Sequence, residues 1–170
     1  MTSPDTVLRA RALLREKTVQ NLPDAAAISK RGDADDRFFA GMLEAAFLVA
    51  AADGELSKEE VGSLIDVVTQ MGEGVTPSEL AGMFYEFTTA LDREGRPARI
   101  AALASHVTEA AARREILGFA ALVALCDGDL APSELFVVHS IAKAFDLDTA
   151  TANGIVRSIA TAMGVSELGK

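Results

Sequence analysis

The amino-acid sequence contains a single cysteine, no tryptophan and no long apolar run. With only Cys126 available, an internal disulfide and a metal cluster held by several cysteines are both excluded. The longest apolar run, Gly118 to Cys126, is far shorter than the roughly 20 residues that span a bilayer. The N-terminal residues also lack the continuous apolar core of a signal peptide. We therefore expect a soluble, cytoplasmic protein that does not insert directly into a membrane.

Aromatic residues are scarce as well, at 5% of the chain, although 49% of the residues are hydrophobic. The hydrophobic residues are mainly Ala, Leu and Val, and they form no long alternating runs of β-branched or aromatic residues. Such a composition favours packed helices over sheets. A chain of 170 residues is long enough to bury a stable core as a single domain. The sequence therefore predicts an all-α fold.

Charge is distributed unevenly along the chain, whose formal net charge is −9. Residues 1–32 carry six basic and three acidic side chains, whereas the remaining residues carry 10 basic and 22 acidic ones. An acidic body of this kind repels the phosphate backbone, so nucleic-acid binding is disfavoured. We assign residues 1–35 to a basic N-terminal amphipathic helix and linker, and residues 36–170 to a helical domain. The basic arm could be a solubilising helix, could dock onto the acidic body, or could bind an anionic partner or membrane surface.

A short acidic turn occurs twice in the chain, 74 positions apart. Each copy begins with Asp-Gly, follows an apolar stretch and leads into a new amphipathic segment. Three carboxylates recur at the same offsets, namely Asp53, Glu55 and Glu60 in the first copy and Asp127, Asp129 and Glu134 in the second. The repeat predicts two helical halves, over about residues 36–92 and 111–165, that are related by an approximate twofold axis.

Hydrophobic periodicity places helices on both sides of each turn. We expect a buried helix over residues 36–52, in which Glu44 either marks an exposed edge or points toward the acidic turns. The segment Thr76-Pro77-Ser78-Glu79 predicts a helix start, because it combines a capping box with proline at the first helical position. The later elements are predicted as a charged connection over residues 92–97, helices over 98–110, 111–126 and 132–145, and a final helix carrying Ile155, Ile159 and Met163.

The acidic turns have two interpretations. As local structure, Asp-Gly forms a tight turn, and Ser57 with Glu60 caps the next helix. In the second copy Ala131 cannot cap, but Pro132 still marks the helix start. As chemistry, the carboxylates of the two turns suit Ca²⁺ or Mg²⁺, which prefer oxygen ligands. One turn supplies too few ligands to enclose either ion, so a cation site needs both turns to converge or an ion that retains many waters.

The motif Ala-Ala-Asp-Gly-Glu-Leu-Ser-x-x-Glu, followed by Asp-Gly-Asp-Leu-x-Pro-x-Glu, resembles the TerB family. That family includes tellurite-resistance proteins and the related N-terminal region of the membrane-anchored co-chaperone DjlA. The resemblance covers about residues 36–165 and implies an all-α bundle of about seven core helices in two pseudo-symmetric halves. Ala131 departs from the Ser or Thr that is usual at its position.

The resemblance also implies a function. Proteins of this kind are expected to be non-enzymatic adaptors in a stress response such as tellurite resistance, with a protein partner that can belong to a membrane-associated complex. It further implies a divalent cation, Ca²⁺ or Mg²⁺, bound at the acidic surface by Asp53, Glu55, Glu60, Asp127, Asp129 and Glu134. The alternative is a purely structural protein-interaction domain that binds no metal.

An enzymatic interpretation has few candidate residues. Cys126 and His139, together with Asp127, could form a hydrolytic or redox site, but a cysteine at a helix end is more often inert packing. His139 has no counterpart in the first copy, where Ile65 occupies the equivalent position. No glycine-rich phosphate loop follows a strand, because no strand is predicted. We therefore favour the non-enzymatic module.

Overall fold

A computed structural model describes residues 33–54, 61–62, 64–66, 76–125, 131–162 and 164. Within these ranges the chain forms helices and no strand, which confirms the predicted all-α class. The helices are α3 (Asp33–Ala50), α5 (Pro77–Glu94), α6 (Arg96–His106), α7 (Ala110–Leu125), α8 (Pro132–Ala144) and α9 (Thr149–Ala162). Residues 61–62 and 64–66 are also helical. None of the helices in the described part of the chain is both long enough and apolar enough to cross a membrane.

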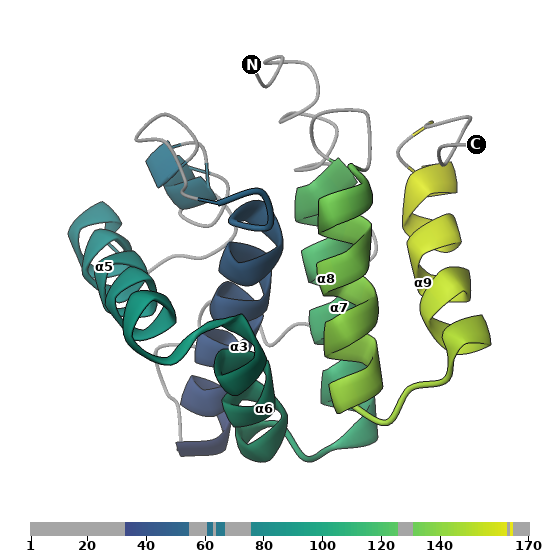
Figure 1. Cartoon of the computed structure of the whole chain (residues 1–170), viewed down its shortest axis with the longest axis horizontal. Coiled ribbons are helices and arrows are strands. Elements are labelled where there is room, and N and C mark those ends of the chain that lie inside the picture. Colours follow the sequence, from purple (N-terminus) through teal and green to yellow (C-terminus); the bar gives the residue numbers. More distant parts are fainter. Residues whose placement is uncertain are drawn as a thin grey trace.

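Helices α3 and α7 form the centre of the bundle and make its most extensive helix–helix contact. They run in the same direction, so they begin at one end of the bundle and finish at the other (Figure 1). Helix α8 runs in the opposite direction and packs against α3, α6 and α7. Helices α5 and α9 form the two edges, where α5 contacts α3 and α6, and α9 contacts α7 and α8. The basic helix predicted near the N-terminus lies outside the described residues.

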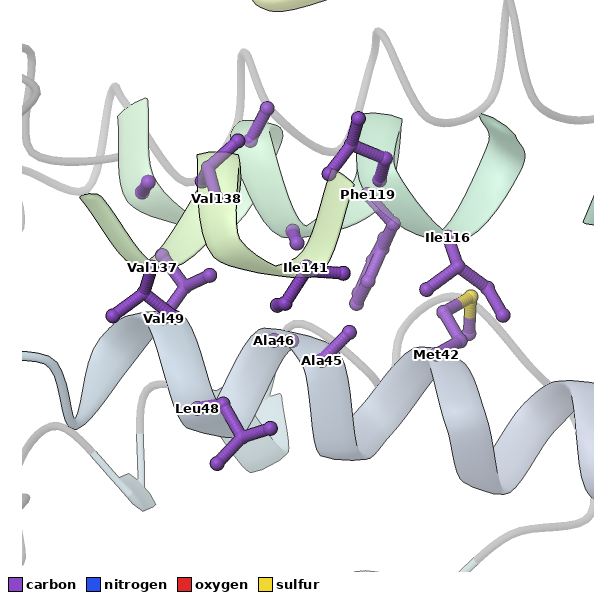
Figure 2. Packing of buried hydrophobic residues seen from close by; sticks show 14 of the residues in the cluster. Met42, Ala45, Ala46, Leu48, Val49, Ile116, Phe119, Val137, Val138 and Ile141 are labelled. Atoms are coloured by element: carbon purple, nitrogen blue, oxygen red, sulfur yellow. The ribbon is translucent and has the colours of Figure 1, made fainter. Parts of the chain in front are cut away.

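Helix α3 from Gly41 onward and the second half of α7 are apolar almost all round, which is why they are largely buried. Every residue from Gly41 to Val49 in α3 is buried, and most of the second half of α7 is buried as well. Figure 2 shows Met42 of α3 opposite Ile116 of α7, with Phe119 and the α8 residue Ile141 above Ala45. The prediction of a buried helix over residues 36–52 is therefore confirmed, with the helix starting three residues earlier and ending at Ala50.

The predicted start of α5 is confirmed in detail. The Thr76 hydroxyl accepts a hydrogen bond from the Glu79 N–H at 3.2 Å, and the Glu79 carboxylate accepts one from the Thr76 N–H at 2.9 Å. Pro77 is the first helical residue. These bonds satisfy two backbone donors that would otherwise have no partner in the helix, so the local sequence alone specifies where α5 begins.

The predicted connection over residues 92–97 is wrong. Helix α5 continues through Glu94 and α6 begins at Arg96, so Gly95 alone separates them. Gly95 has a φ of 84°, in the left-handed region, and its N–H donates to the Leu91 carbonyl at 2.9 Å. A residue with a Cβ is disfavoured in that conformation. The charged residues of this stretch therefore lie on helices, and the corner needs one glycine.

Gly41 and Gly154 provide a matched test of packing density. A Cβ at Gly41 would lie 2.9 Å from Val107 Cγ2, whereas a Cβ at Gly154 would have no atom of the described residues within 4 Å. We expect Gly41→Ala to lower the free energy of unfolding by about 1 kcal/mol, because overpacking exceeds the gain in helix propensity. Gly154→Ala should raise it by about 0.5–1 kcal/mol. Urea denaturation measures both, and equal effects of the two variants would contradict the packing of α3 against Val107.

Candidate functional site

The structure describes two of the six predicted site carboxylates. Asp53 is exposed and lies in the turn that follows α3. This turn is closed by a hydrogen bond of 3.1 Å from the Gly54 N–H to the Ala51 carbonyl, and Gly54 has a φ of 138°. The Asp-Gly pair therefore forms a tight turn, as predicted. Glu55, Glu60, Asp127 and Asp129 lie outside the described residues.

Glu134 lies in the first turn of α8. Its carboxylate accepts a hydrogen bond of 3.0 Å from the Ala131 N–H, and Pro132 is the first residue of the helix. Ala131 contributes no side-chain bond, so only half of a capping box is present. Both predictions for this position, that Ala131 does not cap and that Pro132 begins the helix, are confirmed.

The described residues that flank the two acidic turns lie at the same end of the bundle. Helices α3 and α7 lead into them, and both helices finish at this end, where α8 also begins (Figure 1). Asp53 and Glu134 accordingly lie at one end of the molecule. Among the residues that the structure describes, no group of three or more His, Cys, Asp or Glu side chains could hold a metal ion. Convergence of the six carboxylates on one ion stays a prediction.

Arg96 holds the first acidic turn against α6. Its Nη2 donates a hydrogen bond of 2.6 Å to the Ala51 carbonyl, the same oxygen that accepts from the Gly54 N–H. The Nε of Arg96 is buried and has no hydrogen-bond partner in the described part of the chain. The sequence offered no signal for this contact, because Arg96 and Ala51 are 45 positions apart.

The prediction that Glu44 marks an exposed edge is wrong, and its carboxylate is paired with an arginine of α6. Glu44 is only 7% exposed and is the one charged residue in the described core. Its Oε1 lies 2.7 Å from Nη2 and 2.8 Å from Nε of Arg99 in α6. Burial raises the pKa of Glu44, while the hydrogen bonds and charge of Arg99 act in the opposite direction. The carboxylate tolerates the core because a guanidinium reaches it from another helix.

The guanidinium of Arg99 also connects α6 to the end of α5. Its Nη1 lies 3.0 Å from Oε2 of Glu94, and the other oxygen of Glu94 lies 2.6 Å from Nη2 of Arg93. Hydrogen bonds from the two arginines lower the pKa of Glu94. The result is a chain of four alternating charges, from the exposed Arg93 to the buried Glu44.

Arg113 holds the opposite end of the bundle together. Its guanidinium donates to the carbonyls of Ala104 at 3.0 Å, Val107 at 2.6 Å and Phe145 at 3.1 Å. These carbonyls lie at the C-terminal ends of α6 and α8, where helix carbonyls lack partners and the helix dipole favours a cation. The guanidinium also lies 5.4 Å from the centroid of the Phe145 ring.

The residues suggested for an enzymatic site are dispersed or lie outside the described residues. Nε2 of His139 lies 2.8 Å from Oδ1 of Asn153, which joins α8 to α9. His106 is exposed at the last turn of α6. Cys126 and Asp127 are not among the described residues, so the proposed pairing with His139 has no described geometry.

Comparison with known proteins identifies the family. Residues 45–157 match the family model described as "Tellurite resistance protein TerB". The chain belongs to the TerB family. The TerB match extends from Ala45 in α3 to Arg157 in α9, so it spans both acidic turns and helices α5, α6 and α7 between them. It confirms the predicted resemblance and the TerB-like helical bundle. No curated protein and no solved structure matches this TerB chain.

Proposed function

We propose that this TerB-family protein is a non-enzymatic adaptor whose acidic end binds a divalent cation and a protein partner in a stress response such as tellurite resistance. The observation that supports this proposal is the parallel packing of α3 and α7. Because the two helices finish at the same end of the bundle, the chain enters both acidic turns from that end. A parallel central pair is the arrangement that a site shared by the two halves requires.

The chemistry of the candidate ligands selects the ion. Asp53, Glu55, Glu60, Asp127, Asp129 and Glu134 offer only carboxylate oxygens, which suit Ca²⁺ or Mg²⁺ better than a metal that prefers thiolate or imidazole. Ligands drawn from two turns leave coordination positions to water, and an oxygen of a partner protein can replace such a water. The negative charge at this end would also speed the approach of a basic partner.

A structural interaction module without metal is the second candidate. It is favoured by the hydrogen bond from the Ala131 N–H to Glu134, since that bond gives the carboxylate a capping role. Glu79 makes the equivalent bond to Thr76 at the start of α5, where no acidic turn precedes the helix. Helix capping therefore gives Glu134 a structural role that needs no metal.

Calorimetric titration of the intact chain with Ca²⁺, Mg²⁺, Mn²⁺ and Zn²⁺ distinguishes the two candidates. We expect binding that the double variant Asp53→Asn/Asp127→Asn weakens by about tenfold or more, which corresponds to about 1.4 kcal/mol or more. The control is Glu109→Gln/Asp148→Asn, which removes two exposed carboxylates from other parts of the surface and the same amount of charge. Absence of heat and of a thermal shift at millimolar metal would favour the module without metal.

The same variants test the adaptor role. A partner captured from cell extract by the intact chain and by the control variant, but not by Asp53→Asn/Asp127→Asn, would assign recognition to the acidic end. Repeating the capture with a chelator separates a partner that needs the cation from one that needs only the carboxylates. Capture of the same partner by all three proteins would place recognition elsewhere on the surface.

A further inference from the structure

Helix α5 has an outward face without charge, which we call the Tyr85 face and which consists of Ser78, Ala81, Gly82, Tyr85, Thr88 and Thr89. These residues are all exposed, and Tyr85 is 74% exposed. The hydroxyls of Thr88 and Thr89 donate to the carbonyls of Phe84 and Tyr85, each at 2.9 Å. Because these hydroxyls are occupied within the helix, the methyl groups are left for outside contacts. The Tyr85 face is therefore uncharged, and its main features are the exposed aromatic ring and small side chains.

Gly82 on this face has no role within the described fold. A Cβ at this position would have no described atom within 4 Å, and its φ is not in the left-handed region. Glycine inside an exposed helix costs about 1 kcal/mol relative to alanine. Beside an exposed tyrosine, a glycine leaves a notch that lets another chain segment approach the helix backbone closely. The notch thus supplies an independent indication that the Tyr85 face is a docking surface.

The charges that border the Tyr85 face specify its occupant. Glu79, Glu86 and Asp92 are exposed on α5, and hydrogen bonds from Thr76 lower the pKa of Glu79, which keeps it ionised. Arg93 is the one basic residue of α5 and is paired with Glu94. The exposed charge of α5 is therefore net negative, and two copies of the helix would repel each other. A basic amphipathic segment with small apolar residues complements both the charge and the notch.

Such a segment is present in the same chain. Residues 4–21 combine apolar and small side chains with the basic residues Arg9, Arg11, Arg15 and Lys17. The 11 residues from this segment to the start of α3 can span at most about 36–40 Å. Helix α5, with 18 residues, is about 27 Å long and contacts α3. Tethering raises the local concentration of the segment into the millimolar range, so a weak contact suffices.

We propose that the basic segment over residues 4–21 docks onto the Tyr85 face of α5 in the same molecule. Docking covers the exposed aromatic ring, fills the notch at Gly82 and places arginines beside Glu79 and Glu86. The site is separate from the acidic turns, so it does not depend on cation binding.

Tyr85 reports directly on this contact, because it is the only tyrosine and the chain has no tryptophan. The experiment measures acrylamide quenching of tyrosine fluorescence in the full-length chain, with N-acetyltyrosinamide as the reference for a free ring. We expect the intact chain to be protected relative to this reference. Protection should be lost in Arg9→Glu/Arg11→Glu/Arg15→Glu and in Gly82→Lys, which places a long cationic side chain in the notch.

The matched control is Gly154→Lys, a change at an equally open glycine on α9, which should retain the protection of the intact chain. Far-UV circular dichroism checks that each variant is folded, and the arginine variant changes no residue of the described helices. Quenching of the intact chain at the rate of the free reference would show that Tyr85 is uncovered and would overturn the proposal. A face that only a foreign protein covers would give the same result. If protection survives the arginine changes but disappears on dilution, the proposal is wrong and a second copy of the chain covers the Tyr85 face.

Discussion

Replacing Arg99 with alanine is expected to lower the free energy of unfolding by about 3–5 kcal/mol, because an ionised Glu44 is then left in the core without a partner. Glu44 is buried in α3, and Arg99 supplies both of its bonds described here. Exposed ion pairs are worth far less, since water solvates their charges when the partner is removed. Urea denaturation followed by far-UV circular dichroism measures the loss.

Arg93 offers the matched control. It forms an ion pair of 2.6 Å with Glu94, but its side chain is 71% exposed, so Arg93→Ala should cost less than about 1 kcal/mol. The double change Glu44→Met/Arg99→Met should recover most of the stability lost in Arg99→Ala, because it removes both charges and retains side-chain volume. An Arg99→Ala variant no less stable than Arg93→Ala would contradict the buried pair.

The pH dependence of stability gives an independent readout of the same pair. Burial raises the pKa of Glu44 above its ordinary value of 4.5, so the folded state holds this proton more tightly than the unfolded state does. Stability from this group is present below pH 4.5 and is lost as the pH rises through the raised pKa. Glu44→Gln should remove this loss. Arg99→Ala should extend the loss of stability to higher pH, because the hydrogen bonds and charge of Arg99 no longer lower the pKa of Glu44.

Arg113→Ala is expected to lower the free energy of unfolding by about 2–4 kcal/mol, since three carbonyls lose a charged donor at once. The carbonyls of Ala104, Val107 and Phe145 terminate two helices, and the side chain of Arg113 is largely buried among them. Hydrogen exchange should become faster in the last turns of α6 and α8, where these carbonyls lie. Global unfolding in urea gives the magnitude, and exchange gives the location.

Two substitutions separate geometry from charge at this site. Arg113→Lys keeps the positive charge, but an ammonium group cannot reproduce the planar set of donors, so it should recover less than half of the loss. Arg114→Ala, at the exposed neighbouring position, should change stability by no more than about 0.5 kcal/mol. Full stability of Arg113→Lys would show that the bonds to the three carbonyls are not what holds the helix ends.

The features that the sequence predicted correctly are local ones. The start of α5 follows from Thr76, Pro77 and Glu79, which interact within three positions of each other. The burial of α3 follows from apolar residues all round the helix, and the start of α8 follows from Pro132. The TerB motif likewise depends on residues within single turns, and the match over residues 45–157 bears it out. Such patterns can be read in sequence because the helix repeat brings residues three or four positions apart together.

The candidate site was predicted only in part. The sequence identified Asp53 and Glu134 as residues of two equivalent turns, and the parallel direction of α3 and α7 brings both to one end of the bundle. Residue spacing contains no information on whether two helices 70 or so positions apart run parallel or antiparallel. That direction depends on the intervening helices, among them α5 and α6, which meet at a corner at Gly95.

The sequence by itself therefore determined the all-α class, the family, the starts of α5 and α8 and the repeated acidic turn. The tertiary structure alone decided which charges meet, namely Glu44 with Arg99 across 55 positions and Arg96 with the Ala51 carbonyl across 45. The reason is that a charged residue on an apolar helix face is equally compatible with exposure and with a buried partner. Only the packing of α6 against α3 brings a guanidinium within reach of Glu44, and this contact makes burial of the carboxylate tolerable.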